Sequence, residues 1–345
     1  MRAAPSKRLL LVVASGAVVL AAIGVALAGF RGTGEDDATG ATVSSTFVTA
    51  SRSSSIVVLD LTTGRTRALV RPAGRYLAVS SPTWSPDGHR IAYAQQACPH
   101  CRFRISVVDQ AGTLPRVVSD QREDLNEPDW SPRGDTLVVT KAEHTERELG
   151  LLVLATGGVQ PLEAHGEPAA AEEEEEEEEE VEAPNHPAFS PDGRTVAFEA
   201  EVPVERTEIQ LLGVTSGELS PVESEADHFA YPVFSPTGRR LAYSRTDPGL
   251  TWNICTARLN GRDQVCLTHG PANDTEPTWS PNGRSIVFAS DREDPEVGLR
   301  SLYTINVDGS GLRRLTNGFD DGAPALSPDG TKVAFVRRQI VQFER

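Results

Sequence analysis

The chain has 345 residues, enough for one large domain with a substantial core, and a formal net charge of −16. A chain without a basic surplus cannot neutralise a phosphate backbone, so nucleic-acid binding is disfavoured. Nine of the 49 acidic residues form a single run, residues 172–180, so the rest of the chain is only mildly acidic.

The N-terminus predicts a membrane anchor. Residues 1–8 are basic, residues 9–30 form an uncharged apolar stretch of 22 residues, and residues 31–45 are rich in Gly, Thr, Ser and Asp, as in a flexible tether. The stretch is long enough to cross a bilayer as a helix, and the positive charge before it predicts a single-pass protein with its remainder outside the cytoplasm. The alternative is a cleaved signal peptide, because Ala26-Leu27-Ala28 is an acceptable cleavage site, and the product would then be secreted or periplasmic.

A motif of seven residues, proline-x-aromatic-serine-proline-x-glycine, occurs six times and is the main guide to the fold. Successive copies are 45–47 residues apart, except for one interval of 59 residues that contains the glutamate run. We therefore expect one acidic loop insertion, over residues 163–183. A period in the forties is typical of a β-propeller blade with four strands. The copies begin at Pro82, Pro128, Pro187, Pro232, Pro277 and Pro324.

Each part of the motif has a structural role. The aromatic residue, replaced by Leu326 in the last copy, supplies a large apolar side chain for packing between blades. Ser-Pro-x-Gly predicts a tight turn, because proline fixes φ and glycine accepts a positive φ. An alternating segment such as Ile91-Ala92-Tyr93 then predicts the second strand. A single blade leaves both faces of its sheet exposed, so the blades must pack in a ring.

The six copies resemble the TolB-type β-propeller repeat, a WD-like family of exported bacterial proteins, over residues 46–340. The resemblance implies an all-β, six-bladed propeller. TolB itself carries a separate α/β domain ahead of its propeller, whereas here the predicted anchor and tether stand in that place. The resemblance therefore covers the propeller module and argues against the Tol-Pal envelope role.

The two ends of the repeat region predict one shared blade. Strands two to four of a blade without a first strand are predicted over residues 46–50, 56–61 and 65–70. The last copy of the motif supplies that first strand. Five complete blades and one shared blade then make six. Residues 332–336 compete with residues 46–50 for one place in the shared blade, and the sequence leaves the choice open.

Propellers bind ligands where equivalent loops meet at one mouth of the axial channel. The residue before each copy's first proline is one such position, and we expect this acidic mouth to bind a cation, a cationic peptide or a basic protein surface. Calcium is the one cofactor that its oxygen-rich chemistry suggests, with Glu127, His186 and Glu276 as candidate ligands. The alternative is a set of solvated loop residues. The position holds Ser81, Glu127, His186, Tyr231, Glu276 and Ala323, and Asp124, Asn126, His228, Asp274, Asp320 and Asp321 lie nearby in the sequence.

The four cysteines fit an oxidising compartment and predict disulfides. Cys98 and Cys101 have the spacing of a thioredoxin-type motif but lie between two predicted strands, so we expect a structural disulfide, with redox activity and metal binding as alternatives. Cys255 and Cys266 flank the turn signal Asn260-Gly261. They lie directly opposite each other if the turn loop has two residues, and diagonally if it has four.

The sequence contains no Gly-x-Ser-x-Gly, His-Glu-x-x-His or phosphate-binding glycine loop. We therefore expect a non-enzymatic binding or scaffold protein, held at the membrane by its N-terminal helix, whose ligand is a protein, a peptide or a cell-envelope component. The alternative is a metal-dependent propeller enzyme such as a glycan lyase, for which only His186 and His228 would be channel histidines.

Overall fold

The computed structural model describes residues 50–340 apart from residues 72–77, 114, 144–145, 165–181, 203–205, 223–227, 247–250, 294, 296–297 and 318. All described residues belong to one compact unit of the chain. The predicted anchor over residues 9–30, the tether and the glutamate run lie outside the described residues. Among the residues that are described, no helix is long and apolar enough to cross a membrane.

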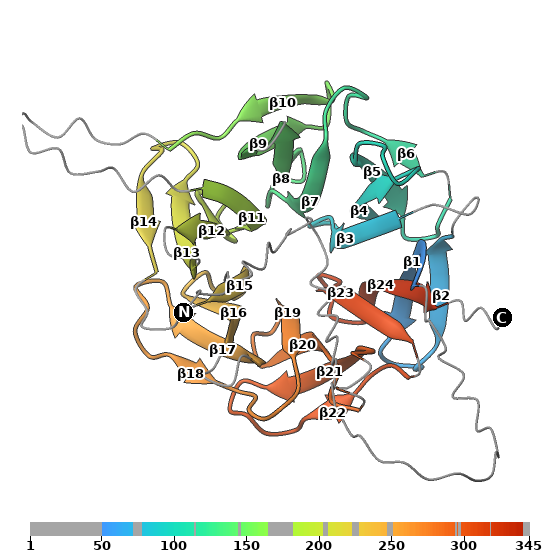
Figure 1. Cartoon of the computed structure of the whole chain (residues 1–345), viewed down its shortest axis with the longest axis vertical. Helices are drawn as coiled ribbons and strands as arrows, with labels where there is room; N and C mark the ends of the chain where they lie inside the picture. Colours follow the sequence, from blue (N-terminus) through green and yellow to red (C-terminus); the bar gives the residue numbers. More distant parts are fainter. Residues whose placement is uncertain are drawn as a thin grey trace, which may run out of the picture. The chain divides into compact units, whose positions relative to one another are not determined.

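The described strands form six antiparallel sheets of four strands each, arranged as blades around one axis (Figure 1). The predicted all-β, six-bladed propeller is thus confirmed. Blade 1 contains β3 (Ala78–Trp84), β4 (Arg90–Gln96), β5 (Arg104–Asp109) and β6 (Arg116–Val117), and blade 2 contains β7 (Leu125–Trp130), β8 (Thr136–Glu143), β9 (Glu146–Val153) and β10 (Gly158–Pro161). Blade 3 contains β11 (Glu182–Phe189), β12 (Thr195–Val202), β13 (Arg206–Gly213) and β14 (Leu219–Pro221). Blade 4 contains β15 (Phe229–Phe234), β16 (Arg240–Thr246), β17 (Trp252–Arg258) and β18 (Val265–Cys266), and blade 5 contains β19 (Asp274–Trp279), β20 (Ser285–Ser290), β21 (Ser301–Asn306) and β22 (Arg313–Arg314).

Blade 6 is built from both ends of the described chain. Its strand order is β23 (Asp320–Leu326), β24 (Lys332–Ile340), β1 (Ala50–Asp60) and β2 (Thr66–Val70). The C-terminal β24 takes the second place and pairs with β1 over most of its length, as in the pair Val57 and Phe335. This answers the question that the sequence left open, in favour of the C-terminal segment. Residues 46–49, the rival segment apart from its last residue, lie outside the described residues.

Each innermost strand carries a β-bulge at the residue before the first proline of the repeat. The pairing register with the second strand shifts there in every blade, for example between Asn126 and Asp129. The residue at the bulge has a φ of 48–58° although it is not glycine, and the bulge bends the strand. The six equivalent residues are Ser81, Glu127, His186, Tyr231, Glu276 and Ala323.

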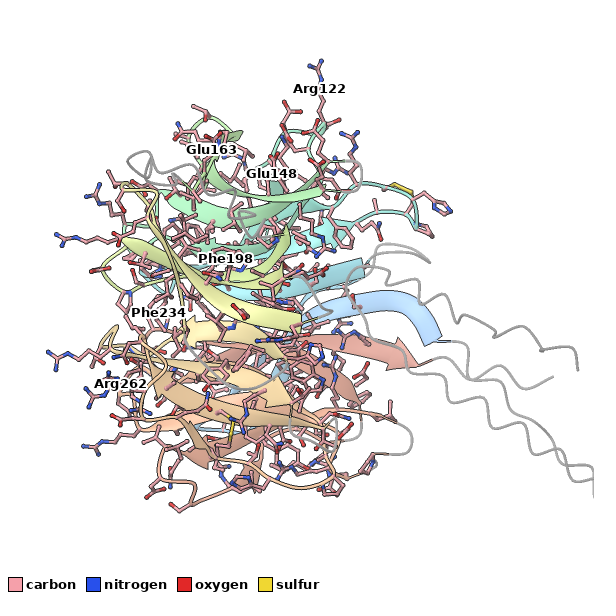
Figure 2. All side chains as sticks on the ribbon, turned by 60° about the vertical axis from the view of Figure 1, so that its left-hand side comes forward. Arg122, Glu148, Glu163, Phe198, Phe234 and Arg262 are labelled. Atoms are coloured by element: carbon pink, nitrogen blue, oxygen red, sulfur yellow. A yellow bond between two sulfur atoms is a disulfide. The ribbon has the colours of Figure 1, made fainter. Side chains whose placement is uncertain are left out.

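The aromatic residue of the repeat packs between its own blade and the preceding one, as predicted. Trp130 of blade 2 is buried against Ala92 and Ile105 of blade 1, and its indole N–H donates to the Thr83 carbonyl across the gap (3.2 Å). The guanidinium of Arg90 lies 4.8 Å from the centre of the same ring. Trp84 and Trp279 donate in the same way to the carbonyls of Ala325 and Val233. In Figure 2, Phe198 and Phe234 lie within the sheets, whereas Arg262 projects from them.

The six Ser-Pro-x-Gly turns form a second ring of contacts. A Cβ added to the turn glycine would face the proline of the preceding blade's turn in all six turns, at 3.2 Å in the case of Gly193 and Pro132. Gly88 faces Pro328 in this way, so the circle closes between blade 6 and blade 1. The glycine is therefore needed for its positive φ and for close packing of neighbouring turns.

Both predicted disulfides are present. Cys98 bonds Cys101 in the loop between β4 and β5, and Cys255 bonds Cys266. Cys255 and Cys266 are also direct partners in the pairing of β17 with β18, which is the register expected for the shorter turn. The described residues contain no free cysteine.

Candidate binding site at the propeller axis

The blades present two rims, and the chain enters and leaves the ring at one of them. Asp320 pairs with Arg338 and Ala50 with Ile340, so the start of β23, the end of β24 and the start of β1 lie together. We call this the entry rim. It also carries the starts of the other innermost strands and the Cys98–Cys101 loop. The opposite turn rim carries the Ser-Pro-x-Gly turns and the hairpins between third and fourth strands, including that of Arg262 (Figure 2).

Three ionisable side chains meet between blades 2 and 3, Glu127 and His186 from the innermost strands and Glu199 from the second strand of blade 3. His186 Nε2 lies 3.2 Å from Glu127 Oε1, and its Nδ1 lies 2.9 Å from Glu199 Oε2. The imidazole therefore has a carboxylate at each ring nitrogen. The side chains of His186, Glu127 and Glu199 are 28%, 12% and 13% exposed, so solvent reaches the group although most of its surface is covered.

The two carboxylates favour a protonated His186. Burial alone would lower the pKa of His186, but the negative charges of Glu127 and Glu199 outweigh burial and raise it to about 9. At neutral pH the imidazolium can then donate from both nitrogens. The result is a fixed positive charge at the axis, held between two fixed negative charges.

A second charged group lies next to this one. The ring of Tyr231 packs on His186 with 4.1 Å between centroids, and burial raises the pKa of the Tyr231 phenol. Glu276 pairs with Arg300 (3.3 Å), and Asp320 lies 3.5 Å from both Arg300 and Arg338. The pKa of Glu276 is lowered, because Arg300, Arg338 and His186 together outweigh its burial. We call the set Glu127, His186, Glu199, Tyr231, Glu276, Arg300, Asp320 and Arg338 the axial cluster.

The bulges explain why two of these carboxylates lie where they do. A residue in the left-handed backbone conformation turns its N–H out of the hydrogen-bond ladder between the strands. That donor then needs another acceptor. Glu127 Oε2 accepts the N–H of His186 in the next blade (2.8 Å), and Glu276 Oε2 accepts that of Ala323 (2.6 Å). In both cases the carboxylate at one bulge caps the bulge of the following blade.

The structure brings only some of the predicted residues together. Glu127, His186, Tyr231, Glu276 and Asp320 belong to the axial cluster. Asp274 and Asp321 are buried and make two-point ion pairs with Arg292 and Arg337, so they stabilise the blades. The remaining predicted residues, Ser81, Ala323, Asp124, Asn126 and His228, contribute no charge to the cluster.

Sequence reasoning missed Glu199, Arg300 and Arg338. Glu199 stands on a second strand directly opposite Asn185, and the equivalent places in the other blades hold small or apolar side chains. A single glutamate, at a position that is small or apolar in the other five blades, was the signal that the sequence offered. The equivalent residues are Ala94, Thr140, Ser244, Ala289 and Val336. Arg300 precedes a third strand, and no repeated residue marks its position.

The candidate calcium ligands do not fit a metal site. Glu127 and His186 pair with each other, whereas Glu276 pairs with Arg300. A protonated imidazole has no free lone pair for a metal, and each carboxylate already accepts a backbone hydrogen bond. Across the described ranges of the chain, no group of three or more His, Cys, Asp and Glu side chains could hold a metal ion.

Fold and site together define a six-bladed β-propeller whose axis is lined by paired charges of both signs. The model of the TolB beta propeller domain matches residues 179–344. Protein Atu1656 of Agrobacterium fabrum is 28% identical over 230 residues, which is 66% of this chain and 71% of that protein. The Tol-Pal system protein TolB of Francisella tularensis is 25% identical over 255 residues, or 72% of this chain, and the chain spans only about half (54%) of that TolB.

A solved structure from Agrobacterium tumefaciens that is named after TolB has the same fold. It superposes with a TM-score of 0.68 at 20% sequence identity, and the match covers 84% of this chain and 99% of that one. The chain is therefore a six-bladed β-propeller that matches the TolB beta propeller domain over residues 179–344 and is similar in sequence to TolB and to Atu1656.

Proposed function

We propose that this protein is a non-enzymatic binding or scaffold protein of the cell envelope, tethered to the outer face of the cytoplasmic membrane, with its ligand seated on the axial cluster. The ligand is a protein, a peptide or another envelope component. The observation that supports this most is that one repeat position places Glu127, His186, Tyr231 and Glu276 around a common axis.

The pairing of charges argues for a polar ligand of mixed charge. Each carboxylate of the cluster already faces His186 or an arginine, so a simple cation would have to displace a cation of the protein. Arg338 is the most exposed charged side chain of the cluster, at 34%. A protein or peptide segment with both an acid and a hydrogen-bond donor could meet Arg338 and the outer carboxylate oxygens together.

Phe319 adds an apolar contact beside these charges. It directly precedes Asp320 at the entry rim, is 49% exposed, and has the Arg337 guanidinium 4.1 Å from its ring centre. Aromatic residues and arginine are enriched at protein–protein interfaces. The entry rim thus offers an aromatic anchor next to a polar cluster.

Photo-crosslinking in the native host would test the binding site. A photoreactive phenylalanine replaces Tyr231 in the cluster or, as the matched control, Arg262 on the turn rim. We expect one dominant adduct from position 231 that is lost at position 262 and weakened by Arg338→Gln. The same adducts from both positions, or none from position 231, would overturn the proposal.

A separate experiment tests the location. Alkaline phosphatase, which is active only outside the cytoplasm, is fused after Arg345 of the full chain. We expect an active fusion that sediments with membranes and stays there after a carbonate wash. An active fusion in the soluble fraction would support the cleaved signal peptide instead, and an inactive fusion would contradict export.

A further inference from the structure

The gap between blades 5 and 6 differs from the other gaps because it lacks the aromatic residue of the repeat. Trp130 is buried in the core between blades 1 and 2, and Trp279 is buried in the core between blades 4 and 5. In blade 6 the same place holds Leu326, which stays partly exposed at the edge of the core formed by Val57, Leu59 and Val287. A leucine cannot fill the space that an indole fills.

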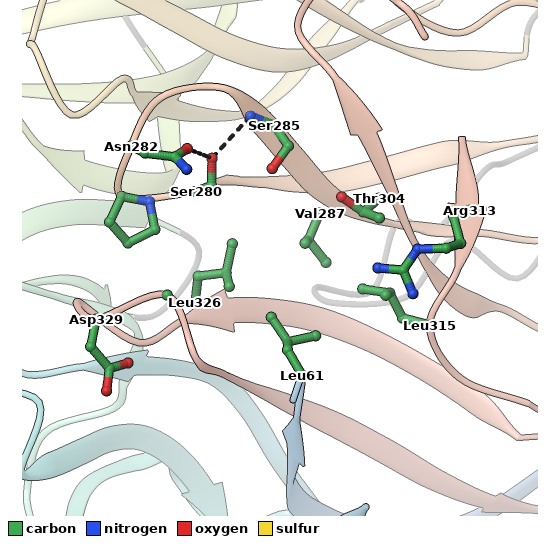
Figure 3. Close-up of a pocket in the computed structure, with 12 residues that line it drawn as sticks. Leu61, Ser280, Asn282, Ser285, Val287, Thr304, Arg313, Leu315, Leu326 and Asp329 are labelled. Atoms are coloured by element: carbon green, nitrogen blue, oxygen red, sulfur yellow. Dashed lines mark hydrogen bonds between the residues drawn. The ribbon is translucent and has the colours of Figure 1, made fainter. Parts of the chain in front are cut away.

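A cavity of about 320 Å³ opens at this place, on the turn rim (Figure 3). Such a volume lies at the lower end of the range for small-molecule sites. Leu61, Val287, Leu315 and Leu326 provide apolar walls, and the lining also includes the polar residues Ser280, Asn282, Ser285 and Thr304. Ser285 stands in blade 5 where Arg90 stands in blade 1, so no guanidinium covers the opening as Arg90 covers Trp130.

One cationic side chain faces the cavity. Figure 3 shows the Arg313 side chain directed toward Leu315 and Val287, and its guanidinium makes no hydrogen bond or ion pair with any described residue. The nearest acid of the lining, Asp329, points away from the cavity in the same view and accepts hydrogen bonds from its own turn, from Ser327 and Thr331. The cavity therefore combines apolar walls and small polar side chains with a positive charge that no described residue pairs.

We propose that the gap between blades 5 and 6 is a binding site for a small aromatic carboxylate. The aromatic ring takes the place of the missing indole against Leu326, Val287 and Leu315. The carboxylate accepts a charge-assisted hydrogen bond from Arg313 at the mouth. The site lies at the rim opposite the axial cluster's entry rim, so it is independent of the function proposed for that cluster.

Equilibrium dialysis of the full chain against indole-3-propionate tests the site, with uncharged 3-methylindole as a second probe. We expect saturable binding of one equivalent. Leu326→Trp restores the repeat's own aromatic residue and fills the cavity, so binding should fall more than about tenfold. Phe234→Trp makes a similar change in the gap between blades 3 and 4, and binding should be unchanged.

The charge is tested separately. Arg313 is exposed, so Arg313→Gln does not endanger folding, and it should weaken indole-3-propionate about tenfold while 3-methylindole changes less than about twofold. Circular dichroism checks that Leu326→Trp is folded, and Leu326→Phe serves as a second filling variant if it is not. Equal binding by the wild type and a folded filling variant, or no saturable binding by the wild type at about 1 mM ligand, would overturn the proposal.

Discussion

The carboxylate of Glu127 contacts His186 twice, once through the backbone N–H at 2.8 Å and once through the imidazole at 3.2 Å. The first contact satisfies a donor that the β-bulge of blade 3 leaves outside the strand ladder, and the second fixes the charge of the imidazole. One side chain of blade 2 therefore stabilises both the backbone and the protonation state of blade 3.

Glu127→Gln should lower the free energy of unfolding by about 1–3 kcal/mol at pH 7, because a largely buried imidazolium loses one of its two counter-charges. Urea denaturation measures the change. Glu143→Gln is the matched control, since Glu143 pairs with Lys141 at the surface and should cost less than about 0.5 kcal/mol. Equal losses in the two variants would contradict the buried role of Glu127.

Stability should depend on pH through His186. Its pKa is about 9 in the folded chain and about 6.5 when unfolded, so the folded state binds this proton more tightly. Its contribution, up to about 3 kcal/mol, is fully present below pH 6.5 and is lost as the pH rises through 9. The difference in unfolding free energy between the wild type and His186→Gln should therefore shrink over this range. An NMR titration midpoint near 6.5 for His186 would refute the expectation.

The ring of turns can be tested with two glycines that share a positive φ. Gly64 has a φ of 70° and nothing within 4 Å of an added Cβ, whereas a Cβ on Gly193 (φ 71°) would lie 3.2 Å from Pro132 Cδ in the preceding blade. Gly64→Ala should cost about 1 kcal/mol from backbone strain alone, and Gly193→Ala about 1 kcal/mol more. Thermal denaturation of both variants gives the difference, and identical midpoints would mean that the turns do not pack tightly.

The two disulfides should differ in their contribution to stability. Cys255 and Cys266 are 11 residues apart and Cys98 and Cys101 only 3, so the first bond closes the longer loop. Replacing both cysteines by alanine should cost about 2–3 kcal/mol for the first pair and about 1 kcal/mol less for the second. Denaturation with and without reductant checks this order, and a larger loss for the Cys98–Cys101 pair would reverse the argument.

The ring of blades, its aromatic packing and its tight turns were predictable, because each depends on chemistry within one repeat. All six turns reproduce the contact of Gly193, and five of the six copies reproduce the aromatic packing of Trp130. The make-up of blade 6 was not predictable in the same way. Two segments that are far apart in the chain both suit its second strand, and only the pairing of β1 with β24 decides between them.

The axial cluster was predicted only in part. The repeat identifies Glu127, His186, Tyr231 and Glu276, since they occupy the same repeat position and share the same left-handed backbone conformation. Their partners depend on which residue the returning strands and loops bring opposite them. Arg300 pairs with Glu276 but follows it in the sequence by a whole β-hairpin. The channel mouth that looks acidic in the sequence is therefore charge-paired in the structure.

The shared blade also sets an order of events during synthesis. Strand β1 leaves the ribosome first, yet its longest partner, β24, is the last strand of the described chain to be made. Until β24 arrives, β1 and β2 form a two-stranded hairpin that is marginally stable in water. Blades 1 to 5 can form one after another in the meantime, but the circle can close only after translation has passed Ile340.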